Sequence, residues 1–156
     1  MQKSETTRSR SFILSTLTPV PSPIGRGENL EQCMPIHGIR GATTVSADEP
    51  DLILEATREL LEAILDANES MKPEDVGSAL FTVTDDLAST FPAQGARQMG
   101  WGLVPMMCAR EIPVPGSLRR VIRVLVHWNT EMSQDKITHV YLREAVKLRP
   151  DLVAAQ

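Results

Sequence analysis

The chain has 156 residues and a mass of 17.2 kDa, which is enough for one domain with a sizeable core. Its formal net charge is −4 and it has no long basic run, so we expect no nucleic-acid partner. Two cysteines, Cys33 and Cys108, form neither a disulfide framework nor a CxxC metal motif, and no apolar run is long enough to cross a membrane. We therefore expect a reduced, cytoplasmic protein without a membrane partner.

Residues 1–33 differ in composition from the rest of the chain. Ser, Thr, Pro, Gly and Arg dominate, and the one apolar run, "FILSTL", is too short for the core of a signal peptide. Three prolines between residues 19 and 23 would break any regular element. The stretch "LTPVPSPIGRGE" also resembles the translation of a bacterial intergenic repeat. We predict a disordered or spurious N-terminal extension over 1–33, with Met34 as the true start; a targeting arm is the alternative.

The first predicted strand covers residues 36–45, "IHGIRGATTV", which are rich in β-branched and small side chains. Gly38 and Gly41 lie inside it, and glycine within a strand often marks the close approach of another backbone or a ligand. Arg40 lies between these glycines, where a charge is costly unless it is paired. We therefore expect a ligand or a carboxylate near Arg40, with the glycines leaving room for it.

The clearest helix follows at "ADEPDLILEATRELLEAILDAN", where apolar residues recur at helical spacing. Asp48 can cap it and Pro50 suits its first turn. Beyond it, the patterns predict these elements: a turn or short helical piece at "KPEDV", a strand over 77–84, a short helix in "FPAQGARQMG", strands over 102–112, 118–130 and 136–142, and a last helical turn in "REAVKLRPDL". The fold class is therefore α/β or α+β, with a mixed sheet, one long helix and a short one.

Arg123 stands in the middle of the long strand predicted over 118–130. Both faces of that strand are largely apolar, which predicts a strand buried on both sides. Arg123 must then be paired with an acid or with an anionic ligand. Taken alone, it would be interpreted as half of a structural arginine–carboxylate pair.

Other polar side chains could join Arg123 around a small polyanion. They are Arg40 in the first strand, Glu111 at the end of the third, Tyr141 in the last, and Arg149 near the C-terminus. Arginine is preferred over lysine where a planar fork must hold a carboxylate through two hydrogen bonds. Composition and spacing leave open whether these side chains converge.

Five motifs together resemble one known family. "GIRGATTV", "FPAQGAR", "VPMMCAREI", "LRRVIRV" and "HVYLREAVKLRPDL" occur in the order and spacing of the AroH-class (Bacillus-type) monofunctional chorismate mutases, from about Met34 to Leu152. The resemblance implies a chorismate mutase domain over 34–156 with a pseudo α/β-barrel fold. It implies a homotrimer with active sites at the subunit interfaces, and no cofactor or metal. The implied enzyme is an isomerase that converts chorismate to prephenate in phenylalanine and tyrosine biosynthesis.

The implied reaction fits the residue types that are present. It is a concerted rearrangement in which an ether C–O bond breaks as a C–C bond forms, so no nucleophile or general base is required. Holding the dicarboxylate substrate in its reactive conformer lowers the barrier. A fixed cation aimed at the ether oxygen stabilises the charge that develops in the transition state.

The resemblance also implies roles for individual residues. Arg123 is the cation at the ether oxygen, Arg40 binds a substrate carboxylate, and Tyr141 hydrogen-bonds a carboxylate. Glu111 accepts a hydrogen bond from the ring hydroxyl, and Cys108 lies near the same end of the substrate. The remaining implied site residues are Phe91, Ala93, Met106 and Met107 lining the cleft, Gln94 and Arg97 at its mouth, and Leu148 and Arg149 in a mobile segment that closes over the ligand.

Two of these positions depart from the family pattern. Gln94 stands where the best-known member has a lysine, and Met107 stands where that member has a threonine. Both lie at the periphery of the chemistry, so we expect altered substrate affinity and retained activity. The competing hypothesis is a small-molecule binder without this activity, since trimeric α/β folds with interfacial clefts, such as the RidA-like proteins, serve other purposes.

Overall fold

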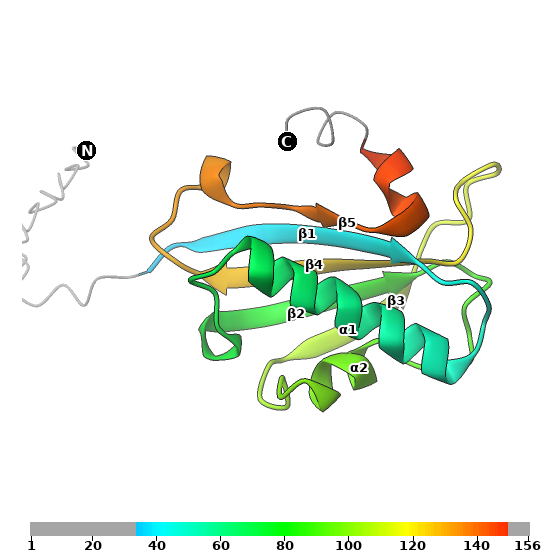
Figure 1. Ribbon diagram of the computed structural model, residues 1–156, viewed down its shortest axis with the longest axis horizontal. Helices are drawn as coiled ribbons and strands as arrows, with labels where there is room; N and C mark the ends of the chain where they lie inside the picture. The colour runs from blue at the N-terminus through cyan, green and yellow to red at the C-terminus, as the bar shows by residue number, and fades with distance from the viewer. Residues whose placement is uncertain (1–33, 150–156) are drawn as a thin grey trace, which may run out of the picture. The chain divides into compact units, whose positions relative to one another are not determined.

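The computed structural model describes residues 34–149, and the extension predicted over 1–33 lies outside them. The described part contains one mixed sheet with the strand order β3-β2-β4-β1-β5 (Figure 1). The strands are β1 (Ile36–Thr44), β2 (Val76–Val83), β3 (Met106–Arg110), β4 (Val121–Asn129) and β5 (Val140–Tyr141). β4 runs antiparallel to β1 and β2, whereas β3 is parallel to β2 and β5 is parallel to β1.

One long helix and one short helix accompany the sheet, as predicted. The long helix α1 (Pro50–Ala67) lies across one face of the strands in Figure 1 and buries the apolar stripe of Ile53, Ala56, Leu60, Leu61 and Ile64. The short helix α2 (Ala93–Gln98) packs against α1 and β3. Three 3₁₀ helices, η1 (Pro73–Asp75), η2 (Gln134–Lys136) and η3 (Arg143–Leu148), complete the described elements. None of the helices within residues 34–149 is both long and apolar enough to cross a membrane.

The cap predicted for α1 is wrong, although Pro50 does begin the helix as predicted. The N-cap residue is Glu49, and its side chain makes no capping hydrogen bond. The Asp48 carboxylate instead accepts hydrogen bonds from the backbone N–H groups of Ala88 and Ser89, at 2.9 and 3.0 Å. These two bonds hold the pKa of Asp48 below its usual value. Asp48 therefore fastens the loop after β2 rather than the helix.

Two strands are less than half as long as predicted, and β4 is shorter by a few residues. β3 begins only at Met106, because turns occupy the preceding residues and bury Trp101. β5 has only two residues. Other backbone groups at this edge of β1 are hydrogen-bonded by side chains rather than by a neighbouring strand. The Gln134 amide bonds to both the N–H and the C=O of Gly38, and His139 Nδ1 accepts the Arg40 N–H at 3.2 Å. The last predicted helical turn is the 3₁₀ helix η3.

Within a single copy of the described chain, β4 is buried on one face only, whereas the sequence predicted burial on both. Ile122, Val124, Val126 and Trp128 are buried, but Arg123, Leu125 and His127 are only half-buried. The reason is that the described chain supplies one long helix, which covers one face of the sheet. The register places the following side chains on the other side, here called the open face: Gly38, Arg40 and Ala42 of β1, Ser78, Leu80 and Thr82 of β2, Met107 and Ala109 of β3, Arg123, Leu125 and His127 of β4, and Tyr141 of β5.

Gly41 is required by helix packing, because the space that its missing side chain leaves lies on the α1 side of the sheet. A Cβ at this position would lie 2.7 Å from Ile64 Cδ1, 3.1 Å from Val124 Cγ1 and 3.2 Å from Leu60 Cδ1. Gly38, by contrast, faces the open side, where a Cβ would meet only Leu125 Cδ1 at an ordinary 3.5 Å. Gly41 therefore allows α1 to approach β1 closely.

We expect Gly41→Ala to lower the free energy of unfolding by about 1–3 kcal/mol, because the added methyl group overpacks the contact between α1 and the sheet. Gly38→Ala is the matched control and should change it by less than about 1 kcal/mol. Urea denaturation of both variants at one protein concentration measures the difference. Equal effects of the two substitutions would contradict this account of Gly41.

Candidate active site

An ion pair between Arg123 and Glu111 lies at the centre of the candidate site. Arg123 comes from the middle of β4, and Glu111 follows β3, where its backbone N–H bonds to Val83 O at 2.9 Å. The Nη1 atom of Arg123 contacts Oε2 of Glu111. Their side chains are 30% and 22% exposed, so the pair is partly shielded from water. Arg123 therefore has the acidic partner that its place in the strand required.

Glu111 is held in its charged form. Burial is the largest influence and would raise its pKa, but the hydrogen bond from the Thr82 hydroxyl and the hydrogen bond and charge of Arg123 together lower the pKa below its usual 4.5. Thr82 donates to Oε1, so each carboxylate oxygen has its own partner. The Glu111 carboxylate is therefore an oriented acceptor at neutral pH.

A cavity of about 410 Å³ adjoins this ion pair, and we call it the arginine cavity. It brings together six of the predicted site residues: Arg40, Glu111, Arg123, Tyr141, Leu148 and Arg149. Three arginines and one glutamate line it, so its lining carries a net positive charge. Such a cavity suits a small polyanion, especially one with carboxylates that arginine forks can hold.

Two residues that line the arginine cavity carry polar side-chain groups with no partner among the described residues. The Tyr141 hydroxyl is buried, and it has no hydrogen-bond partner among the described residues. A buried hydroxyl is usually hydrogen-bonded, so an acceptor is expected beside it. The exposed guanidinium of Arg40 likewise makes no hydrogen bond or ion pair within residues 34–149.

His139 lies behind Arg40 as a neutral imidazole. Burial, followed by the nearby charges of Arg40 and Arg149, lowers its pKa below 6.5. Its Nδ1 atom accepts the backbone N–H of Arg40, which requires that nitrogen to be unprotonated. This hydrogen bond fixes the backbone from which the Arg40 side chain extends.

A second group of predicted residues lies apart from the arginine cavity. Phe91, Gln94 and Cys108 line a cavity of about 480 Å³, here called the Phe91 cavity, beside β3 and the loop after β2. The two cavities share no lining residue. Phe91 is 65% exposed, which is unusual for a phenylalanine. The described chain therefore presents the predicted site as two separate groups of residues.

The other predicted residues line neither cavity. Met107 lies on the open face and is 69% exposed, whereas Met106 packs against the core. Ala93 is buried in the core at the start of α2, and Arg97 is exposed on the same helix. Their predicted contacts with a ligand stay predictions.

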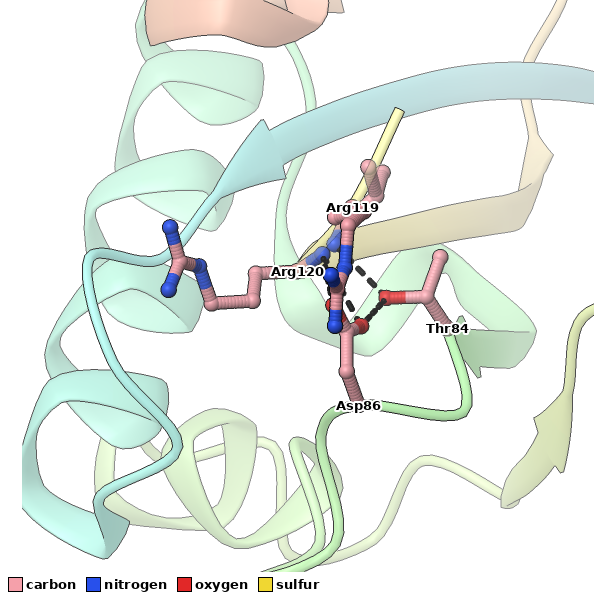
Figure 2. Close-up of polar contacts among 5 residues, drawn as sticks. Thr84, Asp86, Arg119 and Arg120 are labelled. Carbon is pink, nitrogen blue, oxygen red and sulfur yellow. Dashed lines mark hydrogen bonds and ion pairs between the residues drawn. The ribbon is translucent and has the colours of Figure 1, made fainter. Parts of the chain in front are cut away.

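The sequence reasoning missed a carboxylate that fixes the start of β4 (Figure 2). Asp86 accepts the Thr84 hydroxyl at 2.6 Å, the Arg120 backbone N–H at 3.0 Å and the Arg119 Nε–H at 3.0 Å. Thr84 Oγ1 in turn accepts the N–H of Val121 at 3.0 Å. The Arg120 side chain points away from Asp86 in Figure 2. Asp86 thus links the loop after β2 to the start of β4. Its backbone partner, Arg120, lies three residues before Arg123 in the chain.

A short sequence signal for this anchor was present. Thr and Asp directly after a strand commonly bond to nearby backbone N–H groups, and "TDD" follows β2. Burial would raise the pKa of Asp86, but its bonds from Thr84, Arg120 and Arg119 outweigh burial and lower the pKa below 3.8.

We expect Asp86→Asn to lower the free energy of unfolding by about 1–2 kcal/mol at pH 7, because the hydrogen bonds to a charged acceptor are weakened. The folded-state pKa of Asp86 is depressed, so its contribution is full above the unfolded pKa and declines as pH falls through the lower folded value. Denaturation of both proteins from pH 7 to pH 3 should therefore show a difference that narrows below pH 3.8. A difference that is independent of pH would contradict this account.

No group of three or more His, Cys, Asp or Glu side chains within residues 34–149 could hold a metal ion.

Comparison with known proteins shows extensive similarity to one family. Residues 36–152 match the family model described as chorismate mutase type I. The chain is 59% identical to the chorismate mutase AroH of Thermus thermophilus over 121 residues, which are 78% of this chain and 99% of that protein. It is 48% identical to the chorismate mutase AroH of Bacillus subtilis over 120 residues, 76% of this chain and 94% of that protein. Among solved structures, a chorismate mutase from Clostridium thermocellum superposes with a TM-score of 0.68 at 47% identity, covering 69% of this chain and 96% of the other.

Proposed function

The chain belongs to the type I chorismate mutase family, and from this premise we propose that it catalyses the rearrangement of chorismate to prephenate in phenylalanine and tyrosine biosynthesis. The observation that carries the proposal is the arginine cavity, in which Arg40, Arg123 and Arg149 surround a space of about 410 Å³. Chorismate is a small dicarboxylate, and its two negative charges match this net positive cavity. The free thiol of Cys108 is consistent with a cytoplasmic enzyme.

The reaction needs restraint and electrostatics rather than a nucleophile. The ether C–O bond breaks while a C–C bond forms within the same molecule, so no atom, electron or proton leaves it. Fixing the substrate in its compact conformer removes part of the entropic barrier. Negative charge grows on the ether oxygen as the C–O bond lengthens, and a cation that is already in place stabilises this charge.

Arg123 supplies that cation. Glu111 holds one end of its guanidinium, and β4 lies between β1 and β2 in the sheet, so the side chain is oriented before the substrate arrives. The remaining N–H groups of the guanidinium can reach the ether oxygen and an adjacent carboxylate. Because this interaction strengthens as charge develops, it lowers the barrier rather than merely tightening substrate binding.

The other groups of the cavity hold the substrate. Arg40 and the Tyr141 hydroxyl bind carboxylate oxygens, which gives the buried phenol the acceptor that it lacks among the described residues. The Glu111 carboxylate accepts a hydrogen bond from the ring hydroxyl. Leu148 and Arg149 at the end of η3 close over the bound ligand.

The complete site forms between neighbouring copies in a homotrimer. Two observations support this assembly: the open face carries partly exposed apolar side chains, including Leu80, Leu125 and Met107, and the predicted site residues fall into two separate cavities. An uncovered apolar sheet face usually marks an interface. In the proposed trimer, the Phe91 cavity of one copy lies against the arginine cavity of the next and completes the site.

The activity is tested directly with the purified protein. Incubation with chorismate should remove the chorismate absorbance and yield prephenate, without added metal or cofactor. The full chain and a chain beginning at Met34 should behave alike if residues 1–33 take no part. Tight binding of another dicarboxylate without turnover of chorismate would favour the competing small-molecule binder.

A further inference from the structure

Thr82 lies next to the ion pair between Arg123 and Glu111, although nothing about a threonine in a strand indicates a role there. It lies in β2 on the open face, directly opposite Arg123 of β4 on one side and Ala109 of β3 on the other. Its side chain is half-buried, and its hydroxyl donates to Oε1 of Glu111. Thr82 therefore contacts the central ion pair, although it lines neither the arginine cavity nor the Phe91 cavity.

The Glu111 carboxylate is shared between two donors from different strands. Thr82 holds Oε1, and Arg123 Nη1 holds Oε2. An arginine facing a carboxylate with two free oxygens tends to pair with both of them through two parallel N–H groups. Each oxygen of an ionised carboxylate can accept more than one hydrogen bond, so Thr82 acts through orientation rather than by blocking Oε1. With Oε1 turned toward Thr82, the carboxylate is poorly aligned for this two-point arrangement.

We propose that Thr82 is a positioning residue that keeps Glu111 turned so that Arg123 is held through one oxygen and retains free N–H groups for the reaction. The inference rests on the proposed function, in which those N–H groups stabilise the ether oxygen. Without the hydroxyl, the carboxylate can rotate and accept both forks of the guanidinium. Arg123 would then be drawn toward Glu111 and away from the reacting bond, although the charge of the cavity would stay the same.

Loss of the Thr82 hydroxyl should affect kcat and KM differently. Arg40 and Tyr141 hold the substrate carboxylates from β1 and β5, so substrate binding should depend little on Thr82. The interaction of Arg123 with the ether oxygen is realised mainly in the transition state, so its loss lowers kcat rather than raising KM. A residue that served only stability would not produce this separation.

The test compares Thr82→Val, which keeps the shape of the side chain, with Thr82→Ser, which keeps the hydroxyl. We expect kcat for chorismate to fall about tenfold in Thr82→Val while KM stays within about twofold of wild type. Thr82→Ser should stay within about threefold of wild type in both constants. An unchanged kcat in Thr82→Val, a loss carried by KM, or equal losses in the two variants would overturn the proposal.

Crystal structures of the two variants provide a readout that does not depend on turnover. In Thr82→Val, Arg123 should contact both oxygens of Glu111, whereas in Thr82→Ser the contact should remain through one oxygen. An unchanged one-oxygen contact in Thr82→Val would overturn the proposal even if activity falls. Wild-type protein that does not convert chorismate would contradict the proposed function, and the structures would still decide the role of Thr82.

Discussion

Replacing Arg123 with lysine is expected to lower kcat by about a thousandfold or more. Lysine keeps the positive charge and can still contact Glu111, but it loses the planar fork that reaches two acceptors at once. One ammonium group cannot hold Glu111 and also face the ether oxygen in a fixed direction. KM should rise much less than kcat falls, because Arg40, Tyr141 and Arg149 line the same cavity. Loss of chorismate absorbance under saturating substrate measures the effect.

Arg58→Lys is the matched control for this substitution. Arg58 is also a half-buried arginine with a side-chain partner, since it bonds to Gln98, but it lies on α1 and lines neither cavity. Its replacement should leave kcat within about twofold of wild type. Nearly wild-type turnover in Arg123→Lys would contradict electrostatic stabilisation by a fixed guanidinium.

Mixing two inactive variants and allowing them to assemble together is expected to restore part of the activity. Arg123→Lys disables the arginine cavity, and Phe91→Glu places a negative charge in the Phe91 cavity, where it would repel a dianionic substrate. Phe91 is largely exposed, so the glutamate should be tolerated by the fold. In a trimer whose sites lie between neighbours, random mixing of equal amounts leaves about one site in four with both halves intact.

The experiment unfolds the two variants together, refolds them, and compares their turnover with that of each variant treated alone. We expect about a quarter of wild-type activity from the mixture and almost none from either variant. Wild-type protein carried through the same treatment controls for losses on refolding. No recovery in a mixture that has refolded and exchanged subunits would show that each site is built within one chain.

The positions of the main elements could be predicted from local patterns. The spacing of apolar residues, together with Pro50, located α1, and β-branched runs located β1, β2 and β4. The ends of β3 and β5 could not be predicted, because long-range side-chain bonds decide them. The side chains of Gln134 and His139, which are far from β1 in the sequence, bond to the backbone groups of Gly38 and Arg40 at its edge. Few backbone groups of β1 therefore remain for β5 to pair with.

Burial was harder to predict than secondary structure. The apolar character of both faces of β4 suggested that both were covered, yet one helix covers only one of them. The same limitation explains Gly41, because the sequence cannot show that its neighbour is Ile64 of α1 rather than a ligand. The apolar face that the described chain leaves open is the face that the proposed trimer would cover.

The candidate site was predicted only in part by chemistry. Arg123 stood out because a charge in a strand needs a partner, and Glu111 is that partner. The grouping of Arg40 and Tyr141 with them was implied by family resemblance, since β1 and β5 are far apart in the sequence. Thr82 was missed because a threonine in a strand is ordinary until its partner is seen. Asp86 was missed although "TDD" after β2 gave a signal, because that signal does not identify β4 as the segment it binds.

A crystal structure with a bound transition-state analogue, a dicarboxylate that mimics the bridging ether, tests the central claim most directly. We expect the analogue to lie in the arginine cavity, with an Arg123 N–H within hydrogen-bond distance of the ether oxygen. Arg40 and Tyr141 should hold its carboxylates, and Phe91 of a neighbouring copy should close the site. An analogue bound elsewhere, or one whose ether oxygen has no contact with Arg123, would contradict the account.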